Sequence, residues 1–130
     1  FQKMKSLLAK NGKAVVQTIT INEHDFPSYR KGSDFIRSFI FPGGMLPSIS
    51  RFKEEAAKAG LVTHQPHLFG KDYARTLEAW LVSFDHQKEQ VLALGFDEGF
   101  IRLWRFYLAA CAAAFRTNKN DVMQVELSHA

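Results

Sequence analysis

Residues 39–48 read Phe39-Ile40-Phe41-Pro42-Gly43-Gly44-Met45-Leu46-Pro47-Ser48, a run that is too apolar for an ordinary surface loop. The two prolines remove backbone hydrogen-bond donors, and the paired glycines permit backbone angles that other residues avoid, so the run predicts neither a helix nor a central strand. Large apolar residues followed by a rigid turn indicate a loop that packs over the protein's own core or over an apolar ligand. The second alternative would make this segment part of a lipid-handling surface.

The sequence before this run predicts a helix, a strand and a loop. Phe1 to Leu8 has the spacing of one apolar helical face, and Ala14 to Ile21 is β-branched and mostly apolar, which is typical of a buried strand. Residues 22–33 are polar and predict a loop, and residues 34–40 predict a short helix or turn that leads into the apolar run.

The sequence after the run continues with helices and two further strand regions. The expected elements are a helix from its N-cap Ser48 to Ala59, a short strand within 61–68 that Pro66 interrupts, a helix over 71–92, a helix that Asp97 caps, and a strand over 121–128. Helices and strands that follow one another in this way predict the α/β class.

Length and composition fit one domain. Of the 130 residues, 46% are hydrophobic, which can supply a core, but no run approaches the about 18–20 apolar residues that cross a bilayer. No basic and apolar leader opens the chain, so no secretory signal is expected, and the first residue is Phe, so the chain is expected to be a fragment. The single cysteine, Cys111, excludes an internal disulfide and fits a reducing, cytoplasmic compartment.

The charge balance favours lipid over nucleic acid as a partner. The net charge is +4 and the isoelectric point is about 9.3, which suits anionic partners such as phospholipid head groups. The basic residues are scattered among acidic ones, and the chain has no zinc-finger spacing and no RNA-binding aromatic motif. We therefore expect no nucleic acid partner.

Four motifs, in order, resemble the cyclopropane fatty-acyl-phospholipid synthase and mycolic acid cyclopropane synthase family, whose members depend on S-adenosylmethionine. Together they cover nearly the whole chain. The motifs are residues 39–48, Asp72-Tyr73-Ala74-Arg75-Thr76-Leu77-Glu78-Ala79-Trp80, Leu94-Gly95-Phe96-Asp97-Glu98-Gly99-Phe100-Ile101-Arg102-Leu103-Trp104-Arg105, and Ala114-Phe115-Arg116 with Asp121-Val122-Met123-Gln124-Val125.

The resemblance implies that residues 1–130 are one partial domain. It would be the C-terminal half of a Rossmann-like class I methyltransferase sheet, with about three strands at 14–21, 61–68 and 121–128, and with a helical cap on the lipid side. A cofactor site of this type needs a Gly-rich turn after the first strand, and no Gly-x-Gly pattern exists here. We therefore expect no cofactor-binding residue in this chain, and no activity from it alone.

The family reaction, by resemblance, transfers a methyl group to an acyl-chain double bond, and the resulting carbocation loses a proton to close a cyclopropane ring. The family uses a bound bicarbonate beside the new methyl group. The resemblance implies that Tyr73, Gln17 and the backbone of Ile19 take the positions that hold this anion. Spacing alone leaves two alternatives open, because Tyr73 also fits a core stripe with Leu77 and Trp80, and Gln17 fits a satisfied polar group of a strand.

Gln17 departs from the family pattern, which has His at this position. An amide can donate a hydrogen bond to an anion, but it cannot carry a proton near neutral pH. The departure leaves simple methylation or methylenation open beside cyclopropanation.

Five apolar residues are candidates to line the acyl channel, and core packing is the alternative for most of them. They are Phe35, Phe39, Ile40, Phe41 and Met45. The pair His64 and His67 points to opposite faces of a strand and has no cysteine or carboxylate cluster nearby, so we expect no metal site. Cys111 lies on an apolar helical face and is expected to be a buried small hydrophobe.

The expected function of the intact protein is modification of an unsaturated acyl chain of a phospholipid, at the inner membrane face. The alternatives are a methyltransferase of another hydrophobic substrate and a non-catalytic module for lipid binding or oligomerisation. Because strand 14–21 would lose its neighbour in a half-sheet, its open edge predicts a homo-oligomer built on Val15 to Ile21.

Overall fold

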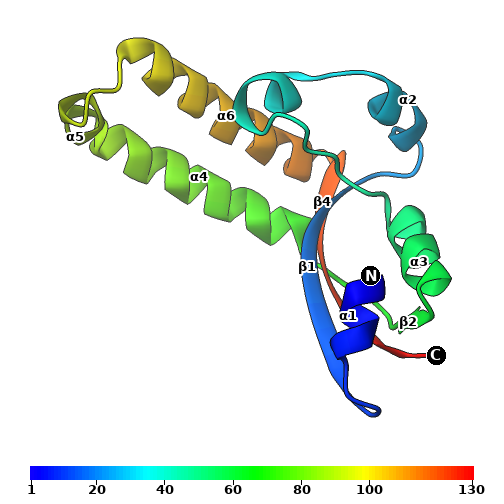
Figure 1. Cartoon of the computed structure of the whole chain (residues 1–130). Coiled ribbons are helices and arrows are strands. Elements are labelled where there is room, and N and C mark those ends of the chain that lie inside the picture. Colours follow the sequence, from blue (N-terminus) through cyan, green and yellow to red (C-terminus); the bar gives the residue numbers. More distant parts are fainter.

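Helices and strands follow one another along the chain, and the computed structural model describes every residue from 1 to 130 (Figure 1). The helices are α1 (Gln2–Leu7), α2 (Phe26–Lys31), the π-helix η1 (Ile36–Ile40), α3 (Ile49–Lys58), α4 (Gly70–His86), α5 (Lys88–Ala93) and α6 (Glu98–Arg116). The strands are β1 (Lys13–Ile21), β2 (Leu61–Thr63), β3 (His67–Leu68) and β4 (Asn120–His129). Figure 1 shows α4 and α6 as a long hairpin that extends from one end of the strands, with α1 and α3 near the other end.

The last strand, β4, is the centre of the sheet. The strand order is β1-β4-β2, β3 also pairs with β4, and every pairing is antiparallel, in a register that joins Gln17 to Gln124. The sheet thus has four strands where about three were predicted. The region 61–68 forms two short strands on either side of Pro66, which has no N–H to donate to a ladder.

The core is divided between the two faces of β4. Met123, Val125 and Leu127 join a cluster with residues of α3 on one face, whereas Val122 joins a cluster with residues of α4 and α6 on the other. This division follows from the alternation of side chains along a strand. The helical hairpin therefore packs on one face only, close to the C-terminal end of β1.

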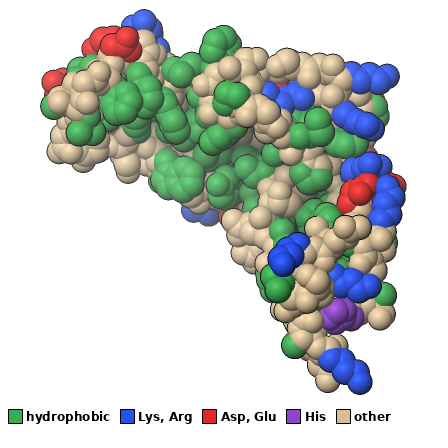
Figure 2. Space-filling model, viewed as in Figure 1, with side chains coloured by type: hydrophobic (Ala, Val, Ile, Leu, Met, Phe, Trp, Pro, Cys, Tyr) green, Lys and Arg blue, Asp and Glu red, His purple; other side chains and the backbone are tan.

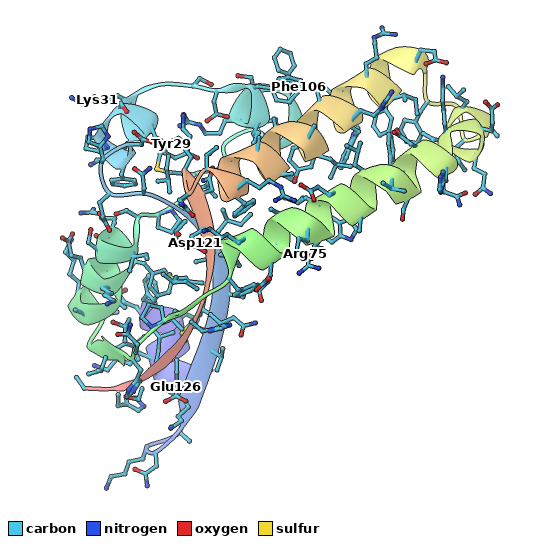
Figure 3. The ribbon with its side chains drawn as sticks, turned by 180° about the vertical axis from the view of Figure 1, so that it is seen from behind. Tyr29, Lys31, Arg75, Phe106, Asp121 and Glu126 are labelled. Carbon is cyan, nitrogen blue, oxygen red and sulfur yellow. The ribbon has the colours of Figure 1, made fainter.

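A side-chain contact fixes the start of α4 to the sheet. The Oδ1 atom of Asp121, at the base of α4 in Figure 3, accepts hydrogen bonds from the backbone N–H groups of Gly70 at 2.7 Å and Val122 at 2.8 Å. A β-carbon at position 70 would lie 2.6 Å from that oxygen, so only glycine fits this contact. The direction of α4, and with it the place of Tyr73, depends on this junction.

Several predicted boundaries are confirmed by the contacts that form them. Ser48 Oγ accepts a hydrogen bond from Arg51 N at 3.3 Å, and Asp97 Oδ1 accepts one from Phe100 N at 2.8 Å, so both residues cap their helices. After α3 the chain turns at Gly60, where φ is +74° and a side chain would be strained.

Three expectations about the elements were wrong. β1 is an edge strand that is buried only at its C-terminal end, at Thr20 and Ile21, because the hairpin leaves half of one face uncovered, and Val15 is 69% exposed. Residues 22–33 are not all loop, because Pro27 lies in the first turn of the short helix α2, where its missing N–H costs nothing. The helix over 71–92 breaks at Gln87 into α4 and α5.

Candidate functional site

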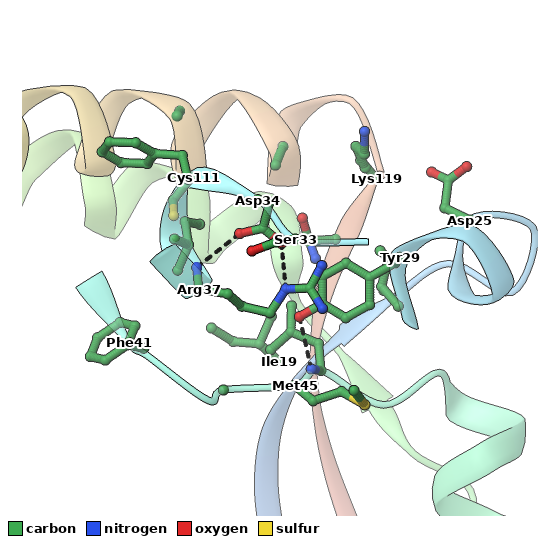
Figure 4. Close-up of a pocket in the computed structure, with 18 of the residues that line it drawn as sticks. Ile19, Asp25, Tyr29, Ser33, Asp34, Arg37, Phe41, Met45, Cys111 and Lys119 are labelled. Atoms are coloured by element: carbon green, nitrogen blue, oxygen red, sulfur yellow. Dashed lines mark hydrogen bonds and ion pairs between the residues drawn. The ribbon is translucent and has the colours of Figure 1, made fainter. Parts of the chain in front are cut away.

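A pocket of about 590 Å³ lies between the end of β1, α2, the chain from Gly32 to Leu46, and α6 (Figure 4). Hydrophobic residues make up 13 of its 22 lining residues. Ligand pockets in proteins have volumes of about 300–1,000 Å³ and mostly apolar walls with a few polar groups. The pocket therefore has the size and lining of a site for an apolar ligand.

Three of the five predicted channel residues line this pocket. They are Phe35, Phe41 and Met45. Phe39 and Ile40 are not among its lining residues: Phe39 is 66% exposed with its ring 5.6 Å from that of Phe35, and Ile40 is half-buried. These two neighbouring side chains of η1 therefore lie outside the pocket, and the apolar run from 39 to 48 contributes Phe41 and residues 44–46 to the wall.

Two aromatic pairs attach the segment around η1 to α6. The ring of Phe35 packs edge-on against Phe106 at 4.7 Å, and the ring of Phe41 packs edge-on against Tyr107 at 5.9 Å. Such pairs contribute about 0.5–1.5 kcal/mol each beyond the area that they bury. Phe106 and Tyr107 of α6 thus fix the positions of Phe35 and Phe41 in the pocket wall.

One wall of the pocket carries a polar cluster. The carboxylate of Asp34 accepts hydrogen bonds from the backbone N–H of Arg37 at 2.9 Å and from its Nε at 2.8 Å. Partial burial opposes ionisation of Asp34, but these hydrogen bonds outweigh it and lower the pKa of the carboxyl group. The guanidinium carbon of Arg37 lies 4.0 Å from the ring centre of Tyr29, whose Oη accepts from Leu46 N at 3.1 Å.

Two groups of α6 in the pocket wall are protonated at neutral pH. Burial, helped by the nearby carboxylate of Asp34, raises the pKa of the Cys111 thiol to about 11. Burial, with smaller effects from Cys111 and Tyr73, raises the pKa of Tyr107 to about 12. Cys111 is half-buried and lines the pocket, which refines the expectation of a buried hydrophobe, and its neutral thiol adds to the apolar wall.

The structure places the three predicted anion-holding residues on one face of the sheet. Gln17 and Ile19 alternate onto the same face of β1, and Ile19 and Tyr73 both pack against the cluster between α4 and α6. Ile19 also lines the pocket, whereas Gln17 and Tyr73 do not. Tyr73 is half-buried, with its ring 5.2 Å from that of Phe115.

The backbone N–H of Ile19 points to the open edge of β1. Ile21 N donates to Pro47 O at 3.0 Å, away from β4, whereas Asn22 N donates to Lys119 O at 3.2 Å, on the β4 side. N–H groups of a strand alternate between its two edges, so the N–H of Ile19 points the same way as that of Ile21. It is a donor that the sheet itself does not use.

The side chain of Gln17 also keeps donors free. Gln124 Nε2 donates to Gln17 Oε1 at 2.8 Å, so the carbonyl of the Gln17 amide has a partner and its NH₂ group makes no hydrogen bond within the chain. The side chain is exposed. The alternative interpretation of Gln17, as a polar group of the strand with all its hydrogen bonds made, therefore applies only to its amide oxygen.

The structure contains neither a metal-binding cluster nor a membrane-spanning helix. No three His, Cys, Asp or Glu side chains lie together in a way that could hold a metal ion, and His64 Nε2 lies 3.1 Å from Ser128 Oγ. None of the helices combines the length and the apolar character that crossing a bilayer requires.

Sequence reasoning missed the polar wall. Tyr29 was assigned to a loop, and Asp34 and Arg37 were not singled out, although their spacing of three is that of an ion pair on one helical turn. That spacing was the available signal, but it does not reveal that the pair faces a pocket.

A family model covers nearly the whole chain. The sequence profile of the mycolic acid cyclopropane synthetase family matches residues 1–125. Tuberculostearic acid methyltransferase UfaA1 of Mycobacterium tuberculosis is 34% identical over 125 residues, which are 95% of this chain and 29% of that protein. The chain thus spans less than half of the length of this relative.

In two similar solved structures, this chain matches nearly half of the solved chain. The cyclopropane synthase MmaA2 from Mycobacterium tuberculosis has a TM-score of 0.85 and 27% identity, over 97% of this chain and 47% of that one. The mycolic acid cyclopropane synthase CmaA1, in a complex with SAH and CTAB, has a TM-score of 0.82 and 30% identity. The match covers 94% of this chain and 46% of that one. The chain belongs to the mycolic acid cyclopropane synthetase family of S-adenosylmethionine-dependent methyltransferases.

Proposed function

We propose that the protein that carries these residues transfers a methyl group from S-adenosylmethionine to a double bond of an unsaturated acyl chain, and that this chain supplies the acyl pocket. The observation that carries the proposal is the apolar pocket built by the run from 39 to 48 and by α6. A carbocation on the acyl chain needs walls that exclude water, because water would quench it. Phe35, Phe41 and the neutral Cys111 thiol provide such walls.

The residues present do not fit the cofactor. Its site needs a Gly-rich turn between a strand and a helix, and the one glycine pair, Gly43-Gly44, follows η1 in the pocket loop instead. We therefore assign no cofactor contact to this chain, and we expect it to be inactive on its own.

The base of the reaction is proposed to be a bicarbonate held by Gln17, Ile19 and Tyr73. Three observations support this site: the free NH₂ of the Gln17 amide, the outward N–H of Ile19, and the position of Tyr73 on the same face of the sheet. An oxyanion with several N–H and O–H donors keeps its charge in a partly apolar site. Gln17 cannot relay a proton, so the proposal covers both a cyclopropane and a methylenated product.

Mass spectrometry of the lipid product tests the function. The intact protein that carries these residues is incubated with S-adenosylmethionine and a monounsaturated phospholipid, and the acyl chain should become heavier by one CH₂, since it gains a methyl cation and loses a proton. Carbon-13 NMR then separates a cyclopropane from a methylene group of the same mass. No such product from any unsaturated phospholipid would exclude the proposal.

We further propose that the protein works in the cytoplasm, bound to the inner membrane face. Figure 2 shows hydrophobic side chains gathered over α6 and the segment beside it, and the exposed members near the pocket are Phe39 (66%), Phe41 (52%), Met45 (54%) and Phe106 (57%). An apolar patch of this kind at a pocket mouth suits a lipid surface.

Vesicle sedimentation checks this patch. Phe39→Ser should reduce the fraction of protein that sediments with phosphatidylglycerol vesicles, because the side chain no longer enters the interface. The matched control is Val62→Ser, an exposed apolar residue (43%) on β2, which should leave the bound fraction unchanged. Equal effects of the two changes would contradict the placement of the membrane surface.

In the isolated chain, which we expect to be inactive, the free edge of β1 is proposed to pair with a second copy, and such a pair uses the Ile19 N–H and so excludes bicarbonate binding there. The edge opposite β4 has no strand partner, and it is closed only at Ile21 by Pro47. Unpaired N–H and C=O groups of an edge invite strand pairing. Light scattering should give twice the 14.8 kDa mass, and Val15→Pro, which removes one outward N–H, should return the mass of one chain. A wild-type monomer at high concentration would refute the pairing.

A further inference from the structure

The most unusual group in the pocket wall is the guanidinium of Arg37. Its side chain is only 12% exposed, yet it lies in a wall whose other residues are mostly apolar (Figure 4). A cation in such a place is stable only when charges or hydrogen bonds compensate its lost hydration. Asp34 supplies one such compensation, through Nε at 2.8 Å.

The guanidinium has more donors than the chain uses. It carries five N–H groups, and only the Nε–H donates to a protein acceptor. The two Nη atoms, with four hydrogens, make no hydrogen bond within the chain, and neither is completely buried, in a side chain that lines the pocket. The fork of an arginine that remains available in this way matches the two oxygens of a carboxylate or phosphate.

Two residues, Asp34 and Tyr29, hold the position of this fork. Asp34 binds both the backbone N–H and the Nε of Arg37, so the side chain leaves η1 in one direction. The ring of Tyr29 covers one face of the guanidinium at 4.0 Å, and Leu46 N in turn fixes the Tyr29 hydroxyl. A group held in place before the ligand arrives loses little conformational entropy on binding.

The other charges of the pocket leave room for an anion. Asp34 is paired with Arg37, and the carboxylate of Asp25 already accepts from Asn22 Nδ2 at 3.1 Å. Lys119 also lines the pocket and forms no ion pair. The charged groups of the pocket that keep free hydrogen-bonding capacity are therefore the cations Arg37 and Lys119, whereas its carboxylates have partners.

We propose that the Nη groups of Arg37 bind the carboxylate or phosphate of an anionic amphiphile whose acyl chain lies in the pocket. The inference rests on the proposed function in that it takes the ligand to be an acyl lipid, and it adds that the lipid must carry a negative charge close to its chain. Asp34 and Tyr29 act as positioning residues for Arg37.

Equilibrium binding to the protein tests this inference without turnover. The probes are oleate, oleyl alcohol, 1-oleoyl lysophosphatidate and inorganic phosphate. The wild type should bind oleate or lysophosphatidate at least about 10-fold more tightly than oleyl alcohol, because charge-assisted hydrogen bonds exceed neutral ones. Inorganic phosphate, which has no chain, should bind more weakly than the lysophosphatidate. If it bound as tightly, the site would recognise free phosphate and the lipid assignment would be wrong.

Substitutions test whether Arg37 is responsible for the tighter binding of anionic amphiphiles. Arg37→Gln should weaken the binding of oleate or lysophosphatidate by about 10- to 100-fold and leave the binding of oleyl alcohol within about twofold. Because that change leaves the Asp34 carboxylate without its partner, the double variant Asp34→Asn with Arg37→Gln restores neutrality and should show the same loss. The control is Arg30→Gln, an exposed arginine of α2 outside the pocket lining.

Two results would overturn the inference. One is a wild type with no preference for the anionic amphiphiles over oleyl alcohol, and the other is an equal loss for charged and uncharged probes in both variants. Failure of the proposed function gives a different pattern, in which the charged lipids bind through Arg37 but no heavier acyl product appears.

Discussion

Replacing Phe115 with alanine should lower the free energy of unfolding by about 3–5 kcal/mol, the usual cost of removing a buried phenyl ring. Phe115 is 2% exposed and belongs to the cluster that joins α4, α6 and β4. The surrounding side chains belong to two helices and a strand, so they cannot close the cavity without moving the whole hairpin. Urea denaturation followed by circular dichroism measures the change.

The substitution should also affect the site. Phe115 is the edge-on neighbour of Tyr73 at 5.2 Å, so the tyrosine loses the contact that sets its ring. The matched control is Phe106→Ala on the same helix, whose side chain is 57% exposed and whose loss should cost about 1 kcal/mol, mainly its pair with Phe35. Similar losses for the two variants would mean that α6 does not pack through Phe115.

The family could be predicted because four motifs resemble it in order, and the α/β class could be predicted because local signals agreed with the fold. Ser48 and Asp97 have side chains that cap helices wherever a helix follows, and both cap one here. The last strand was also predicted, since its alternation of buried residues is strong. These features depend on neighbours in sequence, which a reader of the sequence can see.

The burial of β1 could not be predicted from its residues. Val15 and Ile19 have the same chemistry, but Ile19 lies under the hairpin while Val15 is 69% exposed. Which half of the strand is covered depends on where α4 starts, and the contact between Gly70 and Asp121 decides that across 51 residues of sequence. The residues of β1 carry no information about this contact between two other segments of the chain.

Only part of the candidate site could be predicted, because the rest depends on tertiary contacts. Phe35, Phe41 and Met45 were found because large apolar residues beside a rigid turn must pack on something. Neighbours of the same type, Phe39 and Ile40, were given the same role, although these side chains of η1 lie outside the pocket. The polar wall was missed because Arg37 is buried by the tertiary contact with Tyr29, eight residues earlier.

In the intact protein, replacing Tyr73 with phenylalanine should lower the turnover by about 100-fold while leaving the stability nearly unchanged. The ring contacts of Tyr73 with Phe115 and Trp80 survive the change, and its hydroxyl makes no hydrogen bond within the chain, so little packing or bonding is lost. What is lost is a donor to the proposed bicarbonate, and removing one donor to an anion in an active site costs about 100- to 1,000-fold in rate.

The dependence of rate on bicarbonate distinguishes this role from a structural one. The wild type should slow when bicarbonate is removed from the buffer and recover when it is restored. Tyr73→Phe should need a higher bicarbonate concentration for half its maximal rate, because the anion site keeps only the Gln17 amide and the Ile19 N–H. Leu81→Met, a conservative change of a half-buried residue on the same helix, controls for disturbance of α4 and should leave this concentration unchanged. A Tyr73→Phe variant with wild-type rate and bicarbonate dependence would remove Tyr73 from the site and leave it as the core residue that its spacing also allows.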